Sequence, residues 1–320
     1  MKVVFIGTSE FGVPALNALV ASEEHTVVGV VTQPDRPVGR QQKLTPSPVK
    51  EAAFKNHLKI FQPEQIKRDS VVKQIAYLKP DVIVVAAYGQ ILPKVILDLP
   101  QYGCLNLHAS ILPKFRGASP IQSAILAREK KSGVTVMWMN EGLDTGDVLL
   151  VGETAIKSDD TAQTLHDRLG LIGAKSLLTA LDKIKSGKAT RTAQADLGVP
   201  ASYAKKLTKE DGRIDWTKGK RDIDAHIRAM TPWPSAYTWV PDNAAGGTDQ
   251  KMLKIFTTIF SRRAKGKPGE VVHVDKHGVL VSTGGTGGLL LREVQLEGKK
   301  RMHAAEFARG FNLAVGTILG

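Results

Sequence analysis

Asn106 and His108 are the two side chains whose types and spacing best suit chemistry in this sequence. They lie two residues apart at the end of a predicted strand, residues 104–108, whose other members are apolar. Because alternate residues of a strand face the same side, the amide and the imidazole point the same way. Spacing alone leaves a second interpretation open, namely a buried polar pair whose hydrogen bonds are satisfied.

A third polar side chain, Asp144, lies in residues 143–147 (LDTGD), which we expect to form a turn between two strands. A carboxylate beside an imidazole orients the ring and favours its charged form. Asn106 and a charged His108 would donate hydrogen bonds to the oxyanion that develops in acyl transfer, and Asp144 would hold the ring and help to move a proton away from an attacking amine. Alone, such an Asp is commonly a turn residue bonded to its own backbone.

The elements that must position these residues alternate between strands and helices in the first half of the chain. Strands are predicted at residues 2–6, 27–32, 81–86, 104–108, 134–139 and 148–154, and helices at 12–21, 48–56, 68–78 and 118–128. A longer helix is predicted to begin after Asp160 and to end near Gly187. The pattern is typical of a parallel α/β sheet, in which ligands bind at the carboxyl ends of the strands. We therefore predict a Rossmann-like, mostly parallel sheet domain over residues 1–187.

Residues 188–207 lose this periodicity, and we interpret them as a linker. Five strands are then predicted one after another, at residues 236–240, 251–260, 269–274, 278–283 and 288–296. Such a series suggests a small five-stranded β-barrel like the oligonucleotide-binding (OB) fold, over residues 208–320. The chain carries 24 basic and 19 acidic side chains before residue 204 and 20 and 12 after it, so the smaller domain is the more basic per residue.

Composition constrains the class of protein. The 320 residues are 42% hydrophobic and 23% charged, as in globular proteins, and a single cysteine excludes an internal disulfide. No apolar run approaches the roughly 18 residues of a membrane span, and the N-terminus shows no signal-peptide pattern. The net charge of +13 favours an acidic partner such as nucleic acid. We expect a cytoplasmic monomer with no membrane partner.

Several familiar motifs are absent or incomplete. Residues 7–12 (GTSEFG) resemble a dinucleotide fingerprint, but Ser9 replaces the central glycine that lets a backbone approach a pyrophosphate. No His or Cys cluster has metal-ligand spacing, so we expect no metal. The run Asp144-Thr-Gly occurs once, whereas an aspartic protease needs two carboxylates that share a proton.

Residues 106–118 (NLHASILPKFRGA) and 143–146 (LDTG) together resemble the signature of the folate-dependent formyltransferases. The resemblance implies that 10-formyltetrahydrofolate donates a formyl group. The catalytic set that it implies is Asn106, His108 and Asp144. The folate-contacting segment that it implies comprises Ser110, Ile111, Leu112 and Pro113, with Ile111 where leucine is commoner.

Other segments resemble the members of this family that formylate initiator methionyl-tRNA. Residues 32–49 resemble their specific loop, and the resemblance assigns tRNA contacts to Arg36, Arg40 and Lys43. Two further runs, residues 211–216 (DGRIDW) and 227–234 (IRAMTPWP), resemble their C-terminal domain. The resemblance covers essentially the whole chain. It implies transfer of the formyl group to the amino group of methionyl-initiator tRNA, for translation initiation.

Two alternatives stay open. A related formyltransferase that modifies an amino sugar nucleotide would need neither Arg40 and Lys43 in its loop nor a basic barrel as its second domain. A non-enzymatic RNA-binding protein on an α/β scaffold would not need the complete set of Asn106, His108 and Asp144.

Overall fold

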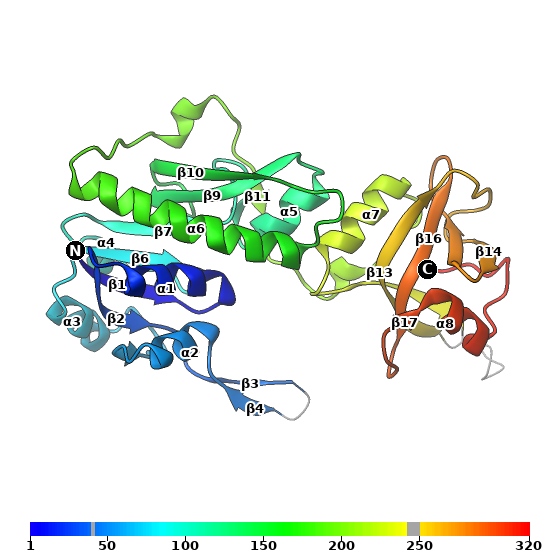
Figure 1. The fold of residues 1–320 in the computed structure, drawn as a ribbon, viewed down its shortest axis with the longest axis horizontal. Helices are drawn as coiled ribbons and strands as arrows, with labels where there is room; N and C mark the ends of the chain where they lie inside the picture. The colour runs from blue at the N-terminus through cyan, green and yellow to red at the C-terminus, as the bar shows by residue number, and fades with distance from the viewer. Residues whose placement is uncertain (40–41, 242–249) are drawn as a thin grey trace. The chain divides into compact units, whose positions relative to one another are not determined.

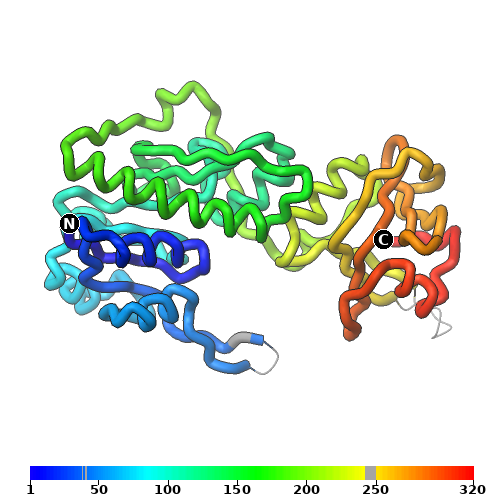
Figure 2. The backbone as a smooth tube through the Cα atoms, viewed as in Figure 1, coloured from blue at the N-terminus to red at the C-terminus, as the bar shows by residue number. Residues whose placement is uncertain are grey.

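The computed structural model describes residues 1–39, 42–241 and 250–320. The chain divides into two compact units, and Figure 2 follows its course through both. The first unit comprises residues 1–120, 131–155 and 165–205. The second unit comprises residues 121–130, 156–164 and 206–320.

A mostly parallel sheet forms the centre of the first unit, with its strands in the order β10-β9-β7-β6-β1-β2-β5 (Figure 1). These strands are β1 (Lys2–Gly7), β2 (Thr26–Val31), β5 (Ile60–Phe61), β6 (Val82–Ala86), β7 (Cys104–His108), β9 (Lys131–Trp138) and β10 (Val148–Ala155). The pairs from β5 to β7 are parallel, whereas β9 is antiparallel to both of its neighbours, β7 and β10. The predicted Rossmann-like sheet is confirmed, and its order reverses at β1, between β2 and β6.

Helices cover both faces of this sheet, which is why β1 and β6 are continuous apolar runs. The helices are α1 (Val13–Ala21), α2 (Pro48–Lys55), α3 (Asp69–Tyr77), α4 (Lys94–Leu97) and α6 (Ala162–Lys185). Val71 and Ile75 of α3 and Ile96 of α4 share one core cluster with Val4 and Ile83 of the sheet. Helices α1 and α6 run along the sheet in Figure 1.

The glycines of the GTSEFG run are explained by packing. A Cβ atom on Gly7 would lie 2.8 Å from the carbonyl oxygen of Ala86, and one on Gly12 would lie 3.2 Å from the Cβ atom of Ala86. The short helix η1 (Glu10–Gly12) can therefore approach the end of β6. This close approach accounts for the run without any dinucleotide.

Residues 32–49, predicted as a loop, contain a hairpin of β3 (Arg36–Val38) and β4 (Lys43–Thr45). Its base is held by Asp35, which accepts hydrogen bonds of 2.7 Å from Lys50 Nζ and from Gln62 Nε2. These hydrogen bonds, with that of Lys50 the larger cause, hold the pKa of Asp35 below its usual value. The sequence pattern missed the hairpin because its strands are only three residues long.

Part of the stretch that we interpret as a linker packs onto the first unit. Its short strand β11 (Tyr203–Ala204) pairs in parallel with β8 (Arg116–Gly117). The 3-10 helix η2 (Gln194–Leu197) begins with a buried Gln194. Residues 188–205 therefore belong to the first unit, whereas residues 206 and 207 belong to the second. The helix α5 (Pro120–Leu126) contributes its residues from Ile121 onward to the second unit.

An antiparallel sheet forms the second unit, with strands in the order β12-β13-β16-β15-β14 and β17 paired to β16. The strands are β12 (Ala236–Pro241), β13 (Gln250–Ser261), β14 (Val271–Asp275), β15 (Gly278–Ser282), β16 (Gly288–Leu296) and β17 (Met302–His303). The predicted series of antiparallel strands is confirmed. Sequence analysis did not predict the helices α7 (Lys220–Ala229) and α8 (Ala304–Phe311) or the 3-10 helix η3 (Glu210–Gly212). In the part of the chain described, no helix is both long and apolar enough to cross a membrane.

Candidate active site

The structure brings together the three residues of the predicted catalytic set. Asn106 and His108 lie at the carboxyl end of β7, and Asp144 lies in the turn between β9 and β10. Asn106 Nδ2 donates a hydrogen bond of 3.3 Å to Asp144 Oδ1, and His108 Nδ1 lies 3.6 Å from the same oxygen. The backbone amide of Gly117 donates to Asp144 Oδ2 over 2.8 Å. An amide, an imidazole and a carboxylate therefore meet at the end of one strand.

The orientation of the His108 ring is set by the backbone. Its Nε2 atom donates to the carbonyl oxygen of Phe115 over 2.8 Å, and the residue is only 5% exposed. Because a carbonyl oxygen can only accept, the Nε2 atom carries a proton, and Nδ1 is the atom that faces Asp144. From the sequence we assigned the holding of this ring to Asp144. The structure shows that the Phe115 carbonyl also holds it, through the opposite nitrogen.

The turn that carries Asp144 has a backbone conformation that few residue types can adopt. Asp144 has a φ of +52°, which non-glycine residues rarely adopt. A Cβ atom on Gly146 would lie 1.7 Å from the carbonyl oxygen of Trp138, so only glycine fits there. Asn140 Oδ1 accepts from the Gly142 amide and from the Thr145 hydroxyl. The Asp144 carboxylate therefore bonds to Asn106 and Gly117, whereas the turn is braced by Asn140.

The predicted folate-contacting segment, Ser110 to Pro113, follows His108 directly. The Thr135 hydroxyl of β9 donates to the Ser110 carbonyl over 2.7 Å and accepts from the Leu112 amide over 3.1 Å. The Ser110 hydroxyl donates to the Lys114 carbonyl over 2.6 Å. The side chains of Ser110 and Leu112 are buried, whereas Ile111 is half-buried. A ligand would therefore meet this segment through its backbone and through Ile111.

Two of the residues assigned to tRNA contacts, Arg36 and Lys43, lie on the β3–β4 hairpin. Arg36 on β3 is exposed and forms an ion pair with Glu64 over 3.0 Å, and Lys43 on β4 is exposed. Arg40 lies outside the described residues. The structure therefore brings Arg36 and Lys43 onto one hairpin, and their role stays a prediction.

Sequence analysis missed three contributors to this site. The Phe115 carbonyl and the Gly117 amide contact His108 and Asp144, and both lie within the run that we had already quoted. Gln194 donates to the carbonyl oxygens of Asp144 and Gly146. No sequence pattern pointed to Gln194, because it lies in residues 188–207, which have no periodicity.

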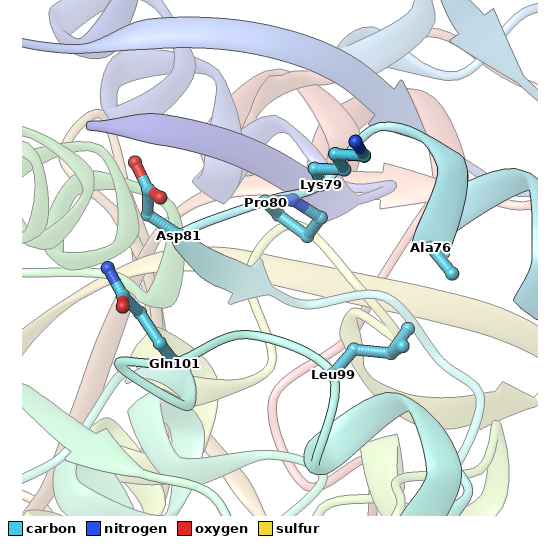
Figure 3. Close-up of a pocket in the computed structure, with 6 residues that line it drawn as sticks. All are labelled: Ala76, Lys79, Pro80, Asp81, Leu99 and Gln101. Carbon is cyan, nitrogen blue, oxygen red and sulfur yellow. The ribbon is translucent and has the colours of Figure 1, made fainter.

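A cavity of about 350 Å³ lies elsewhere on the first unit (Figure 3). Its lining comprises Ala76, Lys79, Pro80, Asp81, Leu99 and Gln101. Pro80 and Asp81 precede β6, so the cavity lies where the parallel strands begin. The candidate set lies at the opposite edge, where β7 ends. Within residues 1–39, 42–241 and 250–320, no group of three or more His, Cys, Asp or Glu side chains could hold a metal ion.

Comparison with known proteins agrees with this arrangement. Residues 1–181 match the family model described as formyl transferase, and residues 206–312 match the model of the formyl transferase C-terminal domain. The chain belongs to the formyl transferase family. The resemblance that we drew from residues 106–118 and 143–146 is thereby confirmed at the level of the family.

This formyl transferase has relatives that match along its whole length. It is 55% identical over 322 residues to the methionyl-tRNA formyltransferase of Methylacidiphilum infernorum, covering 100% of this chain and 98% of that protein. It is 45% identical over 320 residues to the methionyl-tRNA formyltransferase of Geotalea uraniireducens, again covering 100% and 98%. The solved N-formyltransferase of Helicobacter canadensis, in complex with folinic acid and dTDP-3-aminofucose, is 18% identical with a TM-score of 0.62. That likeness covers 91% of this chain and 98% of the other, and it shows a shared fold.

Proposed function

We propose that this formyl transferase moves the formyl group of 10-formyltetrahydrofolate to the amino group of methionyl-initiator tRNA. The observation that carries the proposal is the match to proteins named methionyl-tRNA formyltransferase. Eight of them are 43% to 55% identical over the whole chain. The sugar N-formyltransferases of similar fold are 18% and 20% identical. The enzyme would act as a monomer in the cytoplasm, where it meets charged tRNA.

The catalytic set supports direct transfer without a covalent enzyme intermediate. The methionine nitrogen attacks the formyl carbon, a new C–N bond forms, and the bond from that carbon to the folate nitrogen breaks. Asn106 uses one Nδ2 hydrogen to bond Asp144 and keeps a second for the oxygen that becomes negative. Protonated His108 would supply another donor at Nδ1, with the Asp144 carboxylate offsetting its charge. The proton that the amine loses passes through this pair to the released folate nitrogen.

The formyl donor would bind against residues 110–113. Thr135 fixes the backbone of this segment beside His108. Because this segment follows His108 directly and its backbone is fixed, a formyl donor bound to it would have its formyl carbon near the catalytic set. The donor is a second substrate, and the transfer needs no metal.

The acceptor tRNA would be bound by the hairpin of the first unit and by the second unit. The second unit contains a cavity of about 330 Å³. Its basic lining residues are Arg128, Lys130, Lys157, Arg221 and Arg228, against the acidic Glu129 and Asp224. Phe260 also lines it and is 53% exposed. Cationic groups around an exposed ring suit RNA, because phosphates pair with the charges and a base can stack on the ring.

A formylation assay with two acceptors tests the proposed function. Purified protein is mixed with 10-formyltetrahydrofolate and either methionyl-initiator tRNA or an amino sugar nucleotide, and the formylated product is measured. We expect product with the charged tRNA alone. Uncharged tRNA and the His108→Ala protein serve as controls. Product with the sugar nucleotide and none with methionyl-tRNA would overturn the proposal.

A further inference from the structure

Gln194 holds the turn that carries Asp144. The residue is 4% exposed, and its Nε2 atom donates hydrogen bonds of 2.8 Å to the carbonyl oxygens of Asp144 and of Gly146. The two hydrogens of one amide therefore span the turn on either side of Thr145. Both acceptors belong to the backbone, so the contact fixes the path of the chain.

Arg116 fixes which way the Gln194 amide points. Its Nε and Nη2 atoms donate to Gln194 Oε1 over 3.0 and 2.6 Å. A guanidinium has donors and no acceptor, so the amide oxygen must face Arg116 and the NH2 group must face the turn. Each of these hydrogen bonds of the Gln194 side chain thus has a defined donor and acceptor.

Three consecutive residues, 115–117, connect the hydrogen bonds of Gln194 to the catalytic set. The Phe115 carbonyl holds the His108 ring, the Gly117 amide holds the Asp144 carboxylate, and Arg116 between them holds Gln194. The Asp144 backbone has a φ of +52°, and such a conformation persists only where surrounding contacts hold it. Gln194 supplies two of those contacts.

We propose that Gln194 is a positioning residue for formyl transfer, acting through the turn that presents Asp144 to Asn106 and His108, with Arg116 orienting its amide. The inference rests on the proposed function of the site. Without the two hydrogen bonds from Gln194, the turn can relax, and the Asp144 carboxylate moves away from Asn106 and His108. Neither substrate needs to touch Gln194 for this, so turnover falls while substrate affinity is retained.

Gln194→Glu is the sharpest test. Glutamate has the same size and keeps the contact with Arg116, but its second oxygen would face two carbonyl oxygens and could only accept. We expect kcat to fall by about 10- to 100-fold, as for a small displacement of a reacting group. We expect KM for the formyl donor and for methionyl-tRNA to stay within about twofold, since the binding segments are untouched.

The pH profile gives a second readout. At low pH the carboxyl group introduced by Gln194→Glu becomes protonated and regains one donor, so the ratio of the variant's kcat to the wild-type kcat should rise as pH falls. Arg116→Lys, which retains one donor group, should show a smaller loss of kcat. Asp196→Asn is the matched control, because Asp196 is exposed on the same 3-10 helix and should give wild-type kcat.

The ¹⁵N signals of the His108 imidazole test positioning without any turnover. We expect Gln194→Glu to move them in the same direction as Asp144→Asn, and Asp196→Asn to leave them unchanged. Wild-type kcat and unchanged His108 signals in Gln194→Glu would overturn the inference. Failure of the proposed function would appear differently, as a wild-type protein that does not formylate methionyl-tRNA, and the His108 signals would still decide whether Gln194 positions Asp144.

Discussion

His108 donates its Nε2 proton to the Phe115 carbonyl oxygen over 2.8 Å, and its Nδ1 atom lies 3.6 Å from Asp144 Oδ1. The Nε2 atom is thus occupied by a hydrogen bond to the backbone, so any proton exchange with a substrate must take place at Nδ1. The carboxylate lies beside that atom, and Asn106 donates to the same carboxylate. The three side chains are therefore expected to act as one unit.

Removing any member of this set should slow the chemical step. We expect His108→Ala and Asn106→Ala each to lower kcat by roughly 100- to 1,000-fold, the usual effect of losing one donor to an oxyanion. Asp144→Ala should also lower kcat. Double substitutions should cost less than the product of the single effects, because the residues depend on one another. Single-turnover formylation measures the effect. His273→Ala, at an exposed position on β14, is the control, and near-normal turnover in His108→Ala would contradict the mechanism.

The segment of residues 32–49 should govern the use of tRNA and leave the use of folate unchanged. Arg40→Ala should raise the concentration of methionyl-tRNA needed and slow turnover, because a misplaced acceptor end brings the amine to the formyl carbon in poor geometry. Arg40→Lys should recover part of the loss, since lysine lacks the planar set of donors. Steady-state kinetics with each substrate varied separately tests this. Lys73→Ala on α3 is the control, and a defect confined to the folate parameters would show that residues 32–49 serve the other substrate.

The cavity of the second unit should bind phosphates of the tRNA. Lys157→Glu and Arg221→Glu together should weaken tRNA binding and flatten its salt dependence, by a slope of about 0.7 to 0.9 for each phosphate that is no longer neutralised. Binding titrations at several salt concentrations give that slope. Lys276→Glu, in the turn between β14 and β15, changes the charge of the same unit away from the cavity. Equal slopes for the cavity variant and this control would exclude the cavity from the tRNA-binding surface.

Tyr88 should limit stability at neutral and high pH. Its hydroxyl is buried and has no hydrogen-bond partner among the described residues, and burial raises the pKa of Tyr88 from 10.0 to about 12. Tyr88→Phe should raise the free energy of unfolding by about 1 kcal/mol, since an unsatisfied buried polar group is removed.

The same substitution should change the pH dependence of stability. The unfolded chain ionises Tyr88 near its ordinary pKa, whereas the folded chain resists ionisation until about pH 12. The wild type therefore loses stability as pH rises between these values, and Tyr88→Phe lacks that loss. Urea unfolding at about pH 7 and about pH 10.5, on either side of the ordinary tyrosine pKa, measures both effects. Tyr77→Phe, on a residue that is 82% exposed, should change neither.

Local patterns in the sequence determined the strand that carries the site. Strand β7 spans Cys104–His108, as its apolar pattern predicts, and the period of two places Asn106 and His108 on one side. Local patterns did not reveal α7, because its buried residues, Ile223, Ala225, Ile227 and Ala229, alternate along the chain and do not follow the spacing of one helical face. A pattern of apolar residues over a few positions predicts the correct element only where burial follows the spacing of that element. In α7, which packs against the sheet, burial does not follow that spacing.

The tertiary structure decided which distant residues meet. Asp144 lies 38 residues from Asn106, and Gln194 lies 50 residues beyond Asp144. Their contacts depend on strand order: β9 runs antiparallel to β7, with Trp138 opposite Leu105, and the turn that follows β9 carries Asp144 to Asn106 and His108. No side-chain pattern encodes which nitrogen of His108 faces Asp144, because the Phe115 carbonyl sets it. The sequence alone therefore determined the chemical groups and their local spacing, whereas the tertiary structure decided their partners and orientation, since these rest on hydrogen bonds between segments that only the folded sheet brings together.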